Sequence, residues 1–222
     1  MSPLSARAAL HAQLHAGLAE LGLAVAPGVL ESLLDYVELL ARWNATYNLT
    51  AVRAPDEMIT RHLLDSLAVA PLVEGDTLAD LGTGAGLPGI PLAILAPQRR
   101  HVLIDSNGKK TRFLREAVRV LQLDNVEVQQ SRVEAARGSY DCVTARAFTT
   151  LREMLELGGH LLAPDGVWLA LKGLVDKADV TDLPPGFVVA AVRPLAVPGL
   201  AASRHAIVVK RTAAATAHGH AA

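Results

Sequence analysis

The sequence has little cysteine, almost no net charge and no long apolar run. Its 222 residues include one cysteine, Cys142, which excludes an internal disulfide and a Cys-rich zinc site. A lone thiol favours a reducing compartment, so we expect the cytoplasm. The formal net charge is −1, which excludes a uniformly basic nucleic-acid binder and restricts any RNA contact to a local patch.

Membrane and secretory segments are not expected either. No apolar run reaches the length of about 18 residues that crossing a bilayer requires. The N-terminal stretch interrupts its apolar positions with His and Gln, unlike a signal peptide. Hydrophobic residues make up 51% of the chain, which indicates a globular protein with a substantial core.

The apolar pattern divides the chain into three regions. Residues 5–70 show helical periodicity, and prolines at positions 27 and 55 mark the starts of a second and a third helix. We therefore expect a helical extension over residues 1–70 and an α/β domain over 71–211. The low-complexity residues 212–222 are expected to form a disordered tail.

Short apolar runs alternate with helical stretches from about residue 77 onwards. This alternation predicts a parallel sheet with helices on both faces. Residues 187–197 and 205–209 predict two further strands that form an antiparallel edge. The predicted parallel strands are 78–81, 102–104, 126–128, 141–145 and 167–171, and the helices between them are 88–96, 108–122 and 149–162.

A glycine-rich turn, DLGTGAGLPG over residues 80–89, follows the first predicted strand and opens the next helix. Such a turn lets a nucleotide approach the backbone closely. Gly84, Gly86 and Gly89 match a dinucleotide fingerprint, whereas Asp80 with Gly82 and the later glycines resembles the first motif of S-adenosylmethionine (SAM) methyltransferases. An NAD-binding oxidoreductase therefore remains an alternative.

Two acids bear on this choice. Asp105 lies at the end of the second strand, where either cofactor would place its ribose, so it does not discriminate. Asp80 favours SAM, because a carboxylate there can pair with an α-ammonium group but would repel a pyrophosphate.

Residues 99–119 concentrate positive charge, with seven Lys or Arg against two acids. Arg112, Arg115 and Arg119 recur at helical spacing and share one face. The cluster fits a solvated helix surface or a phosphate-binding patch beside the cofactor.

The chain as a whole resembles the bacterial RsmG (GidB) family of 16S ribosomal RNA methyltransferases. The resemblance covers about residues 40–210, and its motifs occur in family order. They are Trp43-Asn44, Asn48-Leu49-Thr50, Arg61-His62-Leu63-Leu64-Asp65-Ser66, residues 80–94, Leu103-Ile104-Asp105-Ser106, Lys109-Lys110, Arg112-Phe113-Leu114, Ser131-Arg132-Val133-Glu134, Thr144-Ala145-Arg146-Ala147-Phe148, Leu171-Lys172-Gly173 and Arg204-His205.

This resemblance implies a fold and an activity. The fold is the Rossmann-like class I SAM-dependent methyltransferase fold, in which a mostly parallel sheet has an antiparallel edge strand. The activity is that of a 16S rRNA (guanine(527)-N7)-methyltransferase, acting in the 530 loop. The implied partner is 16S rRNA in the small ribosomal subunit or its assembly intermediate, and we expect a monomer. A non-catalytic rRNA-binding assembly factor remains a second alternative.

The glycine-rich motif and the resemblance together indicate the site residues. Those expected to bind SAM are Asp80, Gly82, Gly84, Leu87, Asp105, Ser106, Val133, Glu134 and Arg146. The candidates for RNA contact are cations that could equally lie on a solvated surface, namely Lys109, Lys110 and Arg112 of the basic segment, with Lys172 and Arg204. Arg146 is in addition the candidate for catalysis, holding either the methionine carboxylate or a substrate phosphate, and Phe148 is a candidate for stacking on the guanine.

No acid–base dyad is expected. Guanine N7 already carries an in-plane lone pair, so catalysis needs positioning and desolvation rather than a base. Cys142 sits in an apolar run without a neighbouring base and is expected in the core, which argues against methylation at a pyrimidine carbon. His62 has no partner at a metal-ligand spacing, so no metal is expected.

Overall fold

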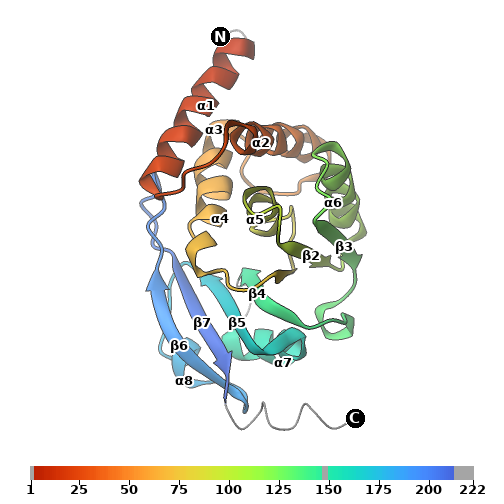
Figure 1. Ribbon diagram of the computed structural model, residues 1–222, viewed down its shortest axis with the longest axis vertical. Helices are drawn as coiled ribbons and strands as arrows, with labels where there is room; N and C mark the ends of the chain where they lie inside the picture. Colours follow the sequence, from red (N-terminus) through yellow and green to blue (C-terminus); the bar gives the residue numbers. More distant parts are fainter. Residues whose placement is uncertain (1–2, 147–149, 213–222) are drawn as a thin grey trace.

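A computed structural model describes residues 3–146 and 150–212, and it contains one seven-stranded mixed sheet with helices on both faces (Figure 1). The strand order is β3-β2-β1-β4-β5-β7-β6. The strands are β1 Thr77–Leu81, β2 Arg100–Asp105, β3 Val126–Gln130, β4 Tyr140–Arg146, β5 Leu162–Lys172, β6 Phe187–Pro194 and β7 His205–Arg211.

The predicted strand directions are confirmed. The first five strands pair in parallel, and β7 pairs antiparallel with both β5 and β6. The apolar runs of β1, β4 and β5 arise because these central strands are buried on both faces. Exposed and half-buried residues alternate along β6, as expected of a strand at the sheet edge.

The helices begin close to the predicted residues, with Pro27 and Pro55 each at a first helical position. The third predicted helix is irregular, because a π-helical turn separates two short α-helical pieces. The helices are α1 Pro3–Glu20, α2 Pro27–Tyr47, α3 Pro55–Met58, α4 Asp65–Leu67, α5 Gly89–Leu95, α6 Gly108–Val120, α7 Leu151–Gly158 and α8 Ala178–Thr181. The shorter turns are the π-helix Ile59–Leu64 and the 3₁₀ turns Ala70–Leu72, Val133–Ala135 and Gly159–Leu161.

The N-terminal helices share a hydrophobic core with one face of the sheet. Leu14 of α1 and Leu40 of α2 belong to the same buried cluster as Leu103 of β2 and Phe113 of α6. Trp43 of α2 packs edge-on against Phe113, with 5.7 Å between ring centroids. The opposite face packs against α7. The helical region is therefore joined to the sheet by a continuous core.

Parallel pairing brings the carboxyl ends of β1 to β5 to one edge of the sheet, where ligands bind in folds of this type. Most of the predicted site residues lie at this edge. Phe148 lies outside the described residues, as does the predicted tail from residue 213 onwards. None of the described helices combines the length and apolarity needed to cross a membrane.

Candidate functional site

A cleft of about 620 Å³ opens at the carboxyl ends of β1, β2 and β3. Most of its walls come from the segments that end or follow these strands, with one residue each from α6 and α7. The lining residues are Gly82, Asp105, Ser106, Lys110, Ser131, Arg132, Val133, Glu134 and Leu157. Five of the nine predicted cofactor-binding residues, namely Gly82, Asp105, Ser106, Val133 and Glu134, are thus brought together.

Asp105 is oriented by the backbone on either side of it. Its carboxylate accepts hydrogen bonds from the amides of Gly84 at 3.0 Å and Asn107 at 2.8 Å. The Lys110 ammonium lies 3.8 Å from the same carboxylate. The side chain therefore reaches the cleft in a fixed orientation, as an acceptor of hydroxyl hydrogen bonds should. Gly84 adopts φ +64°, a conformation that glycine tolerates, and its amide thereby reaches Asp105.

Asp80 corrects one expectation from the sequence. Its side chain is fully buried and accepts hydrogen bonds from the Thr83 hydroxyl at 2.5 Å, the Gly89 amide at 2.9 Å and the Thr144 hydroxyl at 3.0 Å. With both oxygens occupied and shielded, it offers no surface to an α-ammonium group. Its role in this structure is to hold the glycine-rich loop against β4.

Burial also changes the acidity of Asp80. Desolvation raises the pKa of its carboxyl to about 6, although the three hydrogen bonds and the positive charge of Arg146 act in the opposite direction. A carboxylate with this pKa is mostly ionised at neutral pH, at a cost in folding free energy.

Two further contacts shape the loop. A Cβ atom on Gly89 would lie 2.2 Å from Leu103 Cδ2, so only glycine lets α5 pack this closely on the sheet. The Tyr36 hydroxyl of α2 donates a 2.7 Å hydrogen bond to the Ala85 carbonyl oxygen. Leu87 packs in the hydrophobic core and does not line the cleft, contrary to its predicted contact with the cofactor.

A second pocket, of about 260 Å³, lies beside the ends of β4 and β5. Asp65 lines this pocket and pairs with both Arg146 and Arg204. The Nε atom of Arg204 lies 3.0 Å from one of its carboxylate oxygens. The carboxylate is buried, whereas the two guanidinium groups remain partly exposed. We refer to Asp65, Arg146 and Arg204 as the arginine cluster. It carries one net positive charge and shares no lining residue with the first cleft.

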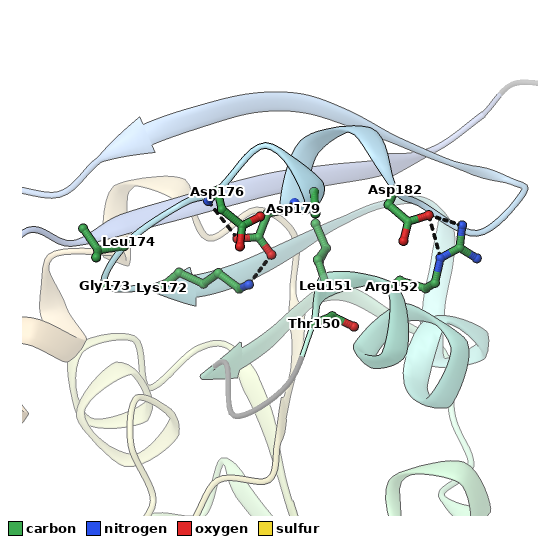
Figure 2. Close-up of a pocket in the computed structure, with 10 residues that line it drawn as sticks. Thr150, Leu151, Arg152, Lys172, Gly173, Leu174, Asp176, Asp179 and Asp182 are labelled. Carbon is green, nitrogen blue, oxygen red and sulfur yellow. Dashed lines mark hydrogen bonds and ion pairs between the residues drawn. The ribbon is translucent and has the colours of Figure 1, made fainter.

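Lys172 has a different environment from the one expected of an RNA contact. Figure 2 shows its ammonium paired with Asp179, and both side chains are largely buried. These residues line a pocket of about 490 Å³ between the start of α7 and the segment that follows β5. Because Asp179 already neutralises Lys172, this lysine is not available to a phosphate in this structure.

The basic segment 99–119 separates into occupied and available cations. Arg100 pairs with Glu127, Arg119 pairs with Glu116, and Arg99 donates to backbone carbonyls. Lys110 lines the cleft at the ends of β1, β2 and β3. The remaining cations, Lys109, Arg112 and Arg115, line a separate hollow of about 590 Å³.

Two residues considered for other chemistry are buried. Cys142 is in the core as expected, and desolvation raises the pKa of its thiol to about 12, so it is no nucleophile at neutral pH. His62 lies 2.9 Å from the Thr50 hydroxyl oxygen, and burial lowers its pKa. Across residues 3–146 and 150–212, no group of three or more His, Cys, Asp or Glu side chains is arranged to hold a metal ion.

Sequence reasoning missed three residues of the site. Tyr36 supports the glycine-rich loop from α2, and Leu157 of α7 adds an apolar wall to the cleft. Asp65 is not among the residues expected to bind SAM or RNA, although the sequence allows it to border the pocket or to fill a capping or buried role, and in the structure it joins two predicted site arginines. The Arg-His-Leu-Leu-Asp-Ser motif was a signal for Asp65, but neither Tyr36 nor Leu157 belongs to a recognisable motif.

Comparison with known sequences gives consistent results. The sequence model of the family described as rRNA small subunit methyltransferase G matches residues 29–208. The chain is 55% identical over 206 residues to ribosomal RNA small subunit methyltransferase G of Stenotrophomonas maltophilia, which covers 91% of this chain and 95% of that protein. The protein of the same name from Xanthomonas euvesicatoria is 56% identical over 181 residues, covering 81% and 85%.

Solved structures share the fold at low sequence identity. TrmN from Thermus thermophilus superposes with a TM-score of 0.54 at 20% identity, covering 69% of this chain and 53% of that one. A SAM-dependent methyltransferase from Aquifex aeolicus gives a TM-score of 0.51 at 19% identity, covering 66% and 90%. These similarities support the class I methyltransferase fold.

Proposed function

The chain belongs to the family of rRNA small subunit methyltransferase G, and from this premise we propose that it methylates N7 of a guanine in the 530 loop of 16S rRNA. As a family member it is a SAM-dependent methyltransferase of small-subunit rRNA, and neither the NAD-dependent alternative nor a non-catalytic role gains support. The finer target, guanine 527, is the one that the family resemblance implies.

The observation that carries the proposal is the cleft at the ends of β1, β2 and β3, because its donors and acceptors fit a nucleoside. When bound, SAM supplies an electrophilic methyl group on its sulfonium. Asp105, held by two amides, accepts the ribose hydroxyls, and Ser106 adds a further polar group. Val133 and Glu134 read the adenine edge, and Leu157 covers the purine ring with apolar surface. Gly82 keeps the loop backbone close to the methionine portion.

Guanine N7 suits a site without a general base. Its lone pair lies in the ring plane and is unprotonated at neutral pH, so the protein needs only to align N7 with the methyl group and exclude water. The buried thiol of Cys142 does not supply the nucleophile that methylation at a pyrimidine carbon requires.

We propose that the arginine cluster binds the substrate rather than the cofactor. Arg146 follows β4 and lines the second pocket together with Arg204, away from the residues that would hold the nucleoside. Together with the carboxylate of Asp65, the two guanidinium groups carry one net positive charge. Such a pair suits a phosphodiester. We therefore assign the phosphate of the target nucleotide to Arg146 and Arg204.

The available cations of α6 make a second contact with RNA. Lys109 and Arg112, joined by Arg115, surround one hollow and have no acidic partner among the ion pairs of the described residues. Contacts of this kind add affinity that depends on salt and not on sequence. Lys110 belongs to the cofactor cleft instead. The monomeric state and the stage of subunit assembly at which the protein acts stay predictions.

Transfer of labelled methyl groups from SAM to purified small-subunit rRNA tests this function. Cleavage of the RNA chain at 7-methylguanine then locates the product, and we expect a single guanine in the 530 loop. Arg146→Ala should abolish methyl transfer. SAM affinity should persist, because Arg146 lines the second pocket and Arg204 still neutralises Asp65. Arg119→Ala, which removes an exposed arginine paired with Glu116, serves as the control and should retain full activity. Label at another base or atom would contradict the assignment.

A further inference from the structure

Leu174 is unusual among the apolar side chains of the described residues. It is 82% exposed, whereas the other exposed large hydrophobic residues range from 37% to 45%. It directly follows Lys172 and Gly173, at the edge of the sheet where the site lies. In Figure 2 its side chain stands apart from Asp176 and Asp179 at one end of the pocket.

The backbone on both sides of Leu174 is anchored. Before it, Lys172 pairs with Asp179, and the His205 ring donates a 3.1 Å hydrogen bond to the Gly173 carbonyl oxygen. After it, the side chain of Val175 packs against the core cluster beneath α7. Asp176 and Asp179 close the segment, since each carboxylate accepts the other residue's amide, at 3.0 and 3.2 Å. The outward direction of Leu174 is thus built into the fold.

A cation lies beside the residue that precedes Leu174. The Arg204 guanidinium is within 3.7 Å of the position that a Cβ on Gly173 would occupy, and Gly173 lines the pocket of the arginine cluster. An exposed apolar side chain that follows a residue next to a cation matches the base and the backbone of a nucleotide. Proteins that open a base stack use apolar side chains in this way.

We propose that Leu174 is a wedge that inserts beside the target guanine and stacks on the neighbouring rRNA base, which holds the guanine out for methylation. This inference rests on the proposed function, because it assigns the base next to the methylated one. The arginine cluster offers one net positive charge to a polyanion on the Gly173 side, which favours RNA over an apolar protein partner. On the other side, Lys172 and Arg152 neutralise Asp179 and Asp182, and Asp176 is the one carboxylate of that pocket without an ion pair among the described residues. Leu174 is a positioning residue and touches no cofactor.

The test variant is Leu174→Ser, which removes the apolar side chain. Two control variants accompany it. Leu174→Met keeps a long apolar side chain at this position, and Val188→Ser removes an exposed apolar residue from edge strand β6. We expect Leu174→Ser to lower kcat/KM for rRNA methylation at least about tenfold, because the RNA base would no longer bury a leucine side chain. SAM affinity and the thermal midpoint should stay unchanged, because Leu174 is exposed in the free protein. Leu174→Met and Val188→Ser should stay near wild type. Rates for Leu174→Ser equal to wild type would overturn the proposal.

A fluorescent base gives the second readout. 2-Aminopurine replaces each neighbour of the target guanine in turn, and its emission reports unstacking when protein binds. The wild type and Val188→Ser should change the emission at one neighbour, and Leu174→Ser should not. An equal change with Leu174→Ser would overturn the wedge, as would a Leu174→Ser defect seen only with ribosomal proteins present, which would indicate a protein partner. If the wild type methylates no small-subunit rRNA, the proposed function fails instead.

Discussion

Replacing Asp80 by asparagine isolates what the buried charge at the start of the glycine-rich loop costs in the free energy of unfolding. Asparagine has the same shape, so its oxygen can accept from Thr83 and Gly89 while its amide donates to the Thr144 hydroxyl oxygen. The hydrogen bonds persist and only the charge is lost. Any pH dependence that separates the two proteins then reports the titration of Asp80 alone.

The sign follows from the raised pKa. The folded protein holds the Asp80 proton with a pKa of about 6, against 3.8 for the unperturbed group, so the folded state binds this proton more tightly than the unfolded state. The wild type therefore loses stability as pH rises from the unfolded value through the folded one. The shift of about two units corresponds to about 3 kcal/mol in the free energy of unfolding. Of this, about 2 kcal/mol falls between about pH 4.5 and about pH 7.5.

Urea unfolding of both proteins across this range measures the effect. Asp80→Asn should gain about 2 kcal/mol relative to wild type as pH rises. Asp141→Asn gives the opposite trend as a control. Burial raises the pKa of Asp141, but hydrogen bonds from the Thr77 hydroxyl and the amides of Asp76 and Thr77 outweigh it and lower the pKa overall. A stability difference between Asp80→Asn and wild type that is flat with pH would refute the reasoning.

Three other substitutions test the packing around the site. Tyr36→Phe leaves the buried Ala85 carbonyl without its donor, so the free energy of unfolding in urea should fall by about 1–3 kcal/mol; an unchanged value would mean that water replaces the hydroxyl. Asp65→Ala leaves two arginines without their shared carboxylate and should cost about 3 kcal/mol in the same assay; wild-type stability would show that the arginines are already well solvated. Gly89→Ala places Cβ 2.2 Å from a Leu103 methyl and should cost about 1–3 kcal/mol and weaken SAM binding in calorimetry; normal binding would count against a tightly packed loop.

The fold could be predicted because the central strands and the helices carry strong periodic signals. The central strands β1, β4 and β5 are apolar on both faces, and Pro27 and Pro55 mark helix starts that the structure retains. The composition of the proposed cofactor cleft could also be predicted. Gly82 and Val133 follow parallel strands and Asp105 ends one, and parallel strands bring their carboxyl ends to one edge.

The arginine cluster could not be derived from local patterns, because its members are distant in sequence. Asp65 lies 81 positions from Arg146 and 139 from Arg204, and no local spacing records either ion pair. The hydrogen bond from Tyr36 to Ala85 spans 49 positions in the same way. Asp80 illustrates a different limit, since an acid at a strand end looks the same in sequence whether its carboxylate faces a ligand or the protein interior.

A calorimetric titration with SAM, comparing the wild type with Asp105→Ala, is the most direct test of the assignment. We propose that this carboxylate accepts the ribose hydroxyls, and the amides of Gly84 and Asn107 fix its orientation. Loss of hydrogen bonds to a charged acceptor should weaken the affinity for SAM about tenfold or more, measured at a temperature at which both proteins are folded. Equal affinities for the two proteins would place the cofactor elsewhere and contradict the account.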